Sequence, residues 1–251
     1  MLPVSYTDFA KYYDILTDNV DYNDIAFYYS GILRKYSDKT GPLLDLGCGT
    51  GNLTVRMERL GFSDITGCDF SKDMLDRASK KSDGIKWLKC DMRELTFKGG
   101  FNFCIATLDS INHLDGERSI GQVFDGVYKA LNKNGIFAAD MNTPYKHLNI
   151  LAGNSYTFDY EEEGLYCVWE NEPSEGDPLN RIDMFLDFFE RQKNGLYKRS
   201  TDSLFEIALP VEKISEMLIK SGFTVLECSE YLTGRDLEEA SDKFMIAAQK
   251  Q

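Results

Sequence analysis

The chain has 251 residues, of which 43% are hydrophobic, so it is long enough for one large domain or for a core domain with a substantial insertion. Its 41 acidic residues outnumber 28 basic ones, for a formal net charge of -13, and such a surface repels nucleic-acid phosphates and disfavours DNA as a partner. The excess is uneven, because residues 151–251 carry 21 acidic and 10 basic side chains, so a partner steered by charge is expected to be cationic.

Targeting and metal-binding signals are not expected in this sequence. No stretch approaches ~20 uninterrupted apolar residues, and the first twenty residues contain several Asp, so neither a membrane span nor a signal peptide is predicted. The six cysteines are scattered without Cys-x-x-Cys spacing, and the two histidines, His113 and His147, lie far apart. We therefore expect free thiols, a cytoplasmic protein and no metal site.

The first half of the chain has the pattern of a parallel sheet flanked by helices. Residues 6–36 predict one or two helices rich in Tyr and Phe, and from Pro42 onward short apolar runs alternate with amphipathic stretches of helical length. The predicted strands are 43–46, 65–68, 85–90, 101–106 and 136–139, and the predicted helices include 52–60, 71–80 and 119–131. Ser71 is the expected N-cap of the second of these helices.

The character of the sequence changes after residue 150. The β-prone, aromatic-rich segments 156–160, 165–170, 182–190 and 196–205, separated by turns, predict an antiparallel insertion. A helix over 210–221 and strands at 224–227 and 244–248 then complete the sheet. The predicted fold class is α/β: a doubly wound, Rossmann-like sheet of seven mostly parallel strands, the last one antiparallel, with the insertion after strand five lying as a lid over its carboxyl edge.

The strongest motif runs from Leu43 to Asn52, where a strand enters a glycine turn that opens a helix. A dinucleotide fingerprint, Gly-x-Gly-x-x-Gly, needs its third glycine at position 52, but here it comes one residue early, at Gly51, so NAD is disfavoured. Asp69 follows the second strand, about where an acid that binds ribose belongs, and Asp91 follows the third.

Over roughly residues 40–140 this order and spacing resemble the class I S-adenosylmethionine (SAM)-dependent methyltransferases. The resemblance implies SAM as cofactor and S-adenosylhomocysteine (SAH) as product, with the turn holding the methionyl part, Asp69 on both ribose hydroxyls and Asp91 on the adenine amino group. The residues that it places at the cofactor are Asp45, Gly47, Cys48, Gly49, Thr50, Gly51, Asn52, Asp69, Phe70, Met74, Asp91, Met92 and Leu108. Aminopropyltransferases that use decarboxylated SAM share the fold, but their turn is usually richer in glycine and acid.

More narrowly, the chain looks like small stand-alone methyltransferases of Gram-positive bacteria and, more distantly, like glycine and sarcosine N-methyltransferases. The matching features are Tyr12-Tyr13-Asp14 and Tyr22 before the sheet, residues 108–113, and Trp169-Glu170-Asn171 in the insertion. This resemblance implies that Tyr13 and Tyr22 cover the cofactor, although aromatic residues on a helix more often belong to the core.

Candidates for chemistry follow the fourth strand, at the edge where doubly wound folds bind ligands. His113 is a candidate base or substrate-orienting residue, and Asn112 and Asp109 share its location, although a His at a strand end is often only hydrogen-bonded structure. Asn142-Thr143-Pro144-Tyr145 looks like the Asn-Pro-Pro-Tyr motif of amino-directed DNA methyltransferases. An N-cap at Thr143 with Pro144 in the first turn explains it without chemistry, and His147 is expected to be a surface or packing residue.

We expect one domain over 1–251, made of a helical cover (1–40), a SAM-binding core (41–150), the lid (151–205) and the final helix and strands (206–251). The predicted function is methyl transfer from SAM to a small molecule. An amine is favoured by the acidic, aromatic lid, whose aromatic residues include Tyr156, Tyr160, Tyr166 and Trp169. Two alternatives stay open: a protein or RNA methyltransferase, and a non-catalytic protein that binds SAM or SAH. The oligomeric state and the acceptor's identity are not predictable from the sequence.

Overall fold

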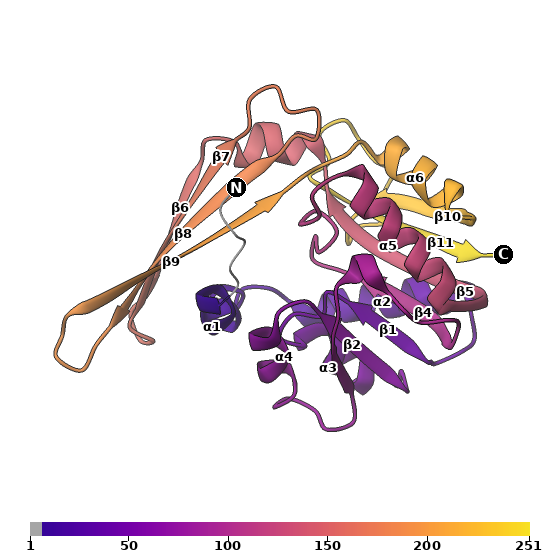
Figure 1. Cartoon of the computed structure of the whole chain (residues 1–251), viewed down its shortest axis with the longest axis horizontal. Helices are drawn as coiled ribbons and strands as arrows, with labels where there is room; N and C mark the ends of the chain where they lie inside the picture. Colours follow the sequence, from indigo (N-terminus) through magenta and orange to yellow (C-terminus); the bar gives the residue numbers. More distant parts are fainter. Residues whose placement is uncertain (1–6) are drawn as a thin grey trace.

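The computed structural model describes residues 7–251. Two helices, α1 (Thr7–Leu16) and α2 (Tyr22–Tyr36), precede the first strand, as predicted (Figure 1). Asp21 caps α2, because its carboxylate accepts from the backbone amides of Asn23 and Asp24 at 2.9 and 3.0 Å. The buried face of α2, which includes Tyr29 and Leu33, packs on one side of the main sheet.

The main sheet has seven strands in the order β10-β11-β5-β4-β1-β2-β3. Their bounds are β1 Leu43–Leu46, β2 Ile65–Asp69, β3 Lys86–Lys89, β4 Phe101–Ala106, β5 Leu131–Asn142, β10 Phe223–Glu230 and β11 Lys243–Lys250. Strands β1 to β5 run parallel to one another, whereas β11 runs antiparallel to both of its neighbours, β5 and β10. The predicted α/β fold with an antiparallel last strand is confirmed.

Helices on both faces of this sheet bury two apolar layers. The remaining helices are α3 Asn52–Arg59, α4 Lys72–Ala78, α5 Glu117–Ala130 and α6 Val211–Lys220, with a 3₁₀ turn η1 at Met92–Glu94 and a π-helical segment η2 at Lys146–Leu151. Ser71 caps α4, as predicted, since its hydroxyl accepts from the Met74 amide at 3.3 Å. Among the described residues, no helix is long and apolar enough to cross a membrane.

The start of β5 differs from the prediction. The strand begins at Leu131 rather than Ile136, because Leu131 pairs with Phe101 and Ile136 pairs with Phe103, so that the strand is irregular between them. Asn134, with a φ of 62°, lies in this irregular stretch. The Asn134-Gly135 pair therefore lies at an irregularity within a continuing strand.

A second, four-stranded antiparallel sheet follows β5 and projects away from the main sheet (Figure 1). Its strands are β6 Ser155–Tyr160, β7 Leu165–Pro173, β8 Ile182–Arg191 and β9 Tyr197–Glu206, which confirms the four predicted segments. One face of this sheet forms an apolar cluster with α1, in which Phe9 and Leu16 pack with Leu165 and Phe188, and Met74 of α4 belongs to the same cluster. Helix α1 therefore links the second sheet to the main domain.

Candidate cofactor and acceptor site

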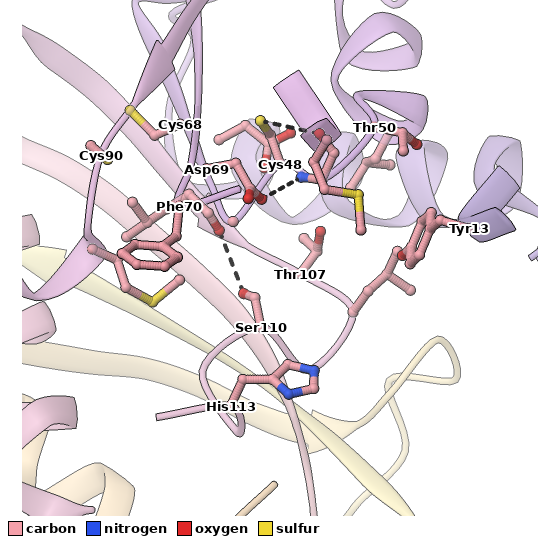
Figure 2. A pocket seen from close by; sticks show the side chains of 18 of the residues that line it. Tyr13, Cys48, Thr50, Cys68, Asp69, Phe70, Cys90, Thr107, Ser110 and His113 are labelled. Carbon is pink, nitrogen blue, oxygen red and sulfur yellow. Dashed lines mark hydrogen bonds between the residues drawn. The ribbon is translucent and has the colours of Figure 1, made fainter. Parts of the chain in front are cut away.

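A cavity of about 450 Å³ lies at the carboxyl ends of β1, β2 and β4 and is covered by α1 (Figure 2). Fourteen of the fifteen predicted cofactor residues line it, and so does His113. These residues are Tyr13, Tyr22, Asp45, Gly47, Cys48, Gly49, Thr50, Asn52, Asp69, Phe70, Met74, Asp91, Met92 and Leu108. The exception is Gly51, which lies beneath the wall, where a side chain would meet the Trp87 ring at 2.6 Å.

The glycine turn between β1 and α3 is held by backbone hydrogen bonds and leaves no room for a side chain at position 47. The amides of Gly47 and Cys48 donate to the Cys68 carbonyl at 2.8 and 3.0 Å. Gly47 has a φ of 75°, and an added Cβ would lie 2.7 Å from the Cβ of Ser110. Glycine is required at position 47 for both reasons, its backbone conformation and its close approach to the loop after β4.

Asp45 carries a buried polar atom that has no hydrogen-bond partner among residues 7–251. Its Oδ2 accepts from the Thr54 hydroxyl at 2.5 Å, whereas its Oδ1 is buried without a hydrogen bond. Burial, with a smaller contribution from the nearby charge of Asp69, raises the pKa of Asp45 to about 7, although the Thr54 hydrogen bond opposes the shift. Asp45 belongs to the cavity lining, and a carboxylate oxygen without a hydrogen-bond partner suits a cationic donor, such as the ammonium group of SAM.

Asp69 and Asp91 differ in what they can still bind. Each oxygen of Asp69 accepts one backbone amide at 2.8 Å, from Gly49 and from Ser71, so each keeps a lone pair for a further donor. Burial raises the pKa of Asp69. Asp91 binds the Arg93 guanidinium through both oxygens, and these hydrogen bonds lower the pKa of Asp91. Asp69 therefore fits a vicinal diol, and Asp91 must share its oxygens with Arg93.

Helix α1 is fastened to the glycine turn by Asp14. Its Oδ1 accepts from the Thr50 hydroxyl at 2.6 Å and from the side-chain amide of Asn52 at 2.9 Å, and its Oδ2 forms an ion pair with Lys81 at 2.8 Å. Thr50 and Asn52 thus line the cavity, and their side chains also hydrogen-bond to α1, the helix that covers it.

The loop after β4 rests on a buried carboxylate, Asp140, in β5. Leu108 and Asp109 have φ values of 53° and 56°, and their amides donate to the Asp140 carboxylate at 2.9 and 3.0 Å. Tyr29 donates to the same group at 2.7 Å, and Lys243 lies 3.1 Å from it. Sequence patterns do not single out Asp140, although a carboxylate inside the apolar run 136–141 is a signal that could have found it.

The three candidates for chemistry separate in the structure. His113 lines the cavity, with Nδ1 2.9 Å from the Phe205 carbonyl oxygen. Asn112 is fully buried outside the lining: its amide nitrogen donates to the carbonyls of Asn142 and Ile207, and its oxygen accepts from the Asn142 amide. Asp109 also lies outside the lining, 3.4 Å from Lys243. Of the three, only His113 faces the space that an acceptor would occupy.

The residues after β5 are structural, as expected. The Thr143 hydroxyl accepts from the Lys146 amide at 3.1 Å, which is the predicted N-cap. His147 is fully buried, with Nδ1 2.7 Å from the Asn180 carbonyl oxygen.

The aromatic residues expected to line the lid, Tyr156, Tyr160, Tyr166 and Trp169, lie outside the cavity lining. Tyr156 and Tyr166 are exposed on its surface, and Trp169 packs edge-to-face on Phe9, with ring centroids 6.0 Å apart. From this sheet only Phe205, near the end of β9, reaches the cavity. The expected aromatic lid therefore does not cover the cavity directly. Helix α1 covers it, and the second sheet packs against α1.

Residues 43–135 match a family model described as a methyltransferase domain. The chain is 30% identical to the putative methyltransferase YqeM of Bacillus subtilis over 249 residues, which is 98% of this chain and 97% of that protein. Its fold is similar to that of a SAM-dependent methyltransferase from Clostridium acetobutylicum, with a TM-score of 0.85, 25% identity and 98% of both chains covered. It is also similar to SAM-bound CalS10, an amino pentose methyltransferase of Micromonospora echinaspora, with a TM-score of 0.76 and 15% identity over both whole chains.

Proposed function

The chain belongs to the class I SAM-dependent methyltransferases, and from that premise we propose that it methylates the nitrogen of a small amine. SAM is the cofactor and SAH the product of this family's reaction. When bound, SAM supplies an electrophilic methyl group on a sulfonium. We assign the ammonium group of SAM to Asp45 and its ribose to Asp69. The adenine falls beside Asp91, Met92 and Phe70, and Tyr13 and Tyr22 form the cover.

The observation that carries the amine proposal is the charge of the cavity wall. Among the described residues that line it, four carboxylates, Asp45, Asp69, Asp91 and Asp115, face one guanidinium, Arg93, which is bound to Asp91 and lies 3.9 Å from Asp115. With SAM bound, Asp45 would pair with its ammonium group and Asp91 stays paired with Arg93, so Asp69 and Asp115 are the carboxylates left to attract a cationic acceptor and repel a phosphorylated one. Aromatic rings on the acceptor side, including Phe9 and Phe205, add cation–π attraction for an ammonium group.

His113 is the proposed base for this reaction. A small amine arrives mostly as its ammonium form and must lose a proton before its nitrogen can attack a methyl group. The Phe205 carbonyl can only accept, so Nδ1 of His113 carries a hydrogen and Nε2 is the basic position. The cavity wall supplies orientation and excludes water, which is most of what an in-line displacement on an activated methyl group requires.

The second sheet belongs to this proposal as a support for the cover. Phe9 and Tyr12 of α1 pack in its apolar cluster, and Lys11 pairs with Glu190 of β8 at 2.7 Å. Because the sheet and the main domain share this helix, we propose that residues 1–251 act as one domain. CalS10, whose likeness to this chain is one of fold, is an example of this fold acting on an amino sugar.

A methyl-transfer screen with labelled SAM tests the proposal. The wild type and Asp45→Asn would be incubated with pools of small amines, carboxylic acids, proteins and RNA, and the labelled fraction would be identified by mass spectrometry. We expect label in the amine pool with the wild type and a strong loss with Asp45→Asn. Label in the protein or RNA pool, with none in the amines, would overturn the small-molecule assignment.

A further inference from the structure

Glu206, the last residue of β9, is a buried carboxylate that faces both histidines of the chain. Its Oε2 accepts from the Asn142 side chain at 2.7 Å and lies 3.2 Å from Nε2 of His147, while its Oε1 lies 3.7 Å from Nε2 of His113. Glu206 is 5% exposed and is absent from the cavity lining, so it does not itself meet the acceptor. Its charge acts through its neighbours.

The end of β9 contacts both nitrogens of the His113 ring. The Phe205 carbonyl fixes the hydrogen on Nδ1, and the carboxylate of the next residue lies on the Nε2 side. An ionised carboxylate can accept a hydrogen bond but not donate one, so it leaves the Nε2 lone pair available. An opposite charge at this distance favours the protonated ring.

Other carboxylates near His113 already have strong partners of their own. Asp109 lies 3.4 Å from Lys243, and the two oxygens of Asp69 accept backbone amides. For Glu206, the described residues include no Lys or Arg within ion-pair distance, and its charged partners are the two histidines. Glu206 also accepts from Asn142 and lies closer to His147 than to His113, but no Lys or Arg among the described residues neutralises its charge, so that charge also acts on His113.

Resting on the proposed function, we propose that Glu206 is a positioning residue for His113, stabilising the imidazolium that forms when the acceptor gives up its proton. In this step an N–H bond of the acceptor ammonium breaks and an Nε2–H bond forms on His113. The freed nitrogen lone pair bonds to the methyl carbon as the carbon–sulfur bond breaks, and that electron pair stays on sulfur. Since His113 follows β4 and Glu206 ends β9, the second sheet would contribute to the reacting side of the cavity.

The first test is NMR on the full-length protein in its SAH complex, which is simple because the chain has only two histidines. The charged groups that interact with His113 include Glu206, Asp69 and Asp109. In Glu206→Gln, the titration midpoint of His113 should fall, because the variant removes the carboxylate charge that lies 3.7 Å from Nε2. The matched control, Glu190→Gln, removes a partly exposed carboxylate of the same sheet and should leave the midpoint unchanged. An unchanged midpoint in Glu206→Gln would overturn the proposal.

The second test is turnover with the amine acceptor found in the screen. Glu206→Gln should lower kcat about 10- to 100-fold, with the KM for SAM, the SAH affinity and the Tm unchanged, and Glu206→Asp should restore part of the loss. His113→Asn can keep the hydrogen bond to the Phe205 carbonyl but lacks Nε2, and in that background Glu206→Gln should cost nothing further. If the kcat losses of His113→Asn and Glu206→Gln multiply in the double variant, Glu206 does not act through His113. If the loss in Glu206→Gln comes with a lower Tm and weaker SAH binding, the role of Glu206 is structural. Either result would overturn the proposal.

The results of these tests distinguish a failure of the Glu206 proposal from a failure of the amine assignment. If the wild type transfers no label to any amine, the proposed function is wrong, yet the His113 titration still decides whether Glu206 sets the charge of that ring. If amines are methylated and Glu206→Gln is fully active, the proposed function stands and the role of Glu206 is refuted.

Discussion

The affinity of the cavity for SAH should fall as the pH drops below about 7, because Asp45 must be ionised to accept the ammonium group. Asp45 is 1% exposed, and burial raises its pKa to about 7. About nine-tenths of this carboxyl is then ionised at pH 8 and about one-tenth at pH 6. Binding selects the ionised form, so the apparent affinity should drop about tenfold between these values, or ~1.4 kcal/mol, with a proton released on binding below the pKa.

Calorimetric titration with SAH between pH 5.5 and 8.5 measures this directly, and buffers of different ionisation enthalpy count the released proton. Asp45→Asn should bind more weakly at every pH and lose the part of the pH dependence that Asp45 supplies. Asp91→Asn is the matched control and should keep that dependence, because Arg93 lowers the pKa of Asp91 and keeps it ionised throughout. A flat wild-type affinity from pH 6 to 8, in protein shown to be folded by circular dichroism, would refute the assignment of the ammonium group to Asp45.

Three further predictions test the ribose contact, the glycine turn and the charge of the wall. Asp69→Ala loses two charge-assisted hydrogen bonds of ~1.5 to 3 kcal/mol each, so SAM affinity measured by calorimetry should drop at least tenfold; an unchanged affinity in a folded variant would mean that the ribose lies elsewhere. Gly47→Ala combines a φ of 75° with a contact of 2.7 Å to Ser110, and should cost ~1 to 3 kcal/mol in thermal unfolding. Gly49→Ala, which has a positive φ but no atom within 4 Å of the added Cβ, should cost less, and equal losses would contradict the steric argument. The kcat/KM for a cationic amine should fall as salt shortens the Debye length from ~30 to ~10 Å, whereas insensitivity to salt would show that the acidic wall does not steer the acceptor.

Much of the main sheet could be predicted because buried parallel strands appear in the sequence as short apolar runs. The predicted runs 43–46 and 101–106 match β1 and β4 residue for residue. The glycine turn, the acid that ends β2 and the acid that follows β3 were also predictable, since each contact there depends on residues at fixed offsets from a strand end. The predicted run 136–139 lies within β5, but the strand begins earlier, at Leu131, because it continues through the irregular stretch at Asn134-Gly135.

The polar network behind the cavity could not be predicted, because its members meet across long stretches of chain. Asp140 contacts Lys243, and Glu206 contacts His113, at separations of about one hundred residues, for which the sequence has no local pattern. The second sheet shows a related limit. Alternation predicts which side chains share a face but not which face meets α1, and in β7 that face includes Leu165 rather than Tyr166.

A crystal structure of the full-length protein with SAH tests the central claim most directly. We predict that the ribose hydroxyls bind Asp69, that the amino group lies at Oδ1 of Asp45, and that the side of the sulfur from which the methyl group departs faces His113. A ribose away from Asp69, or a sulfur whose methyl side faces Phe70 and α4, would contradict both the cofactor assignment and the amine-methylation mechanism built on it.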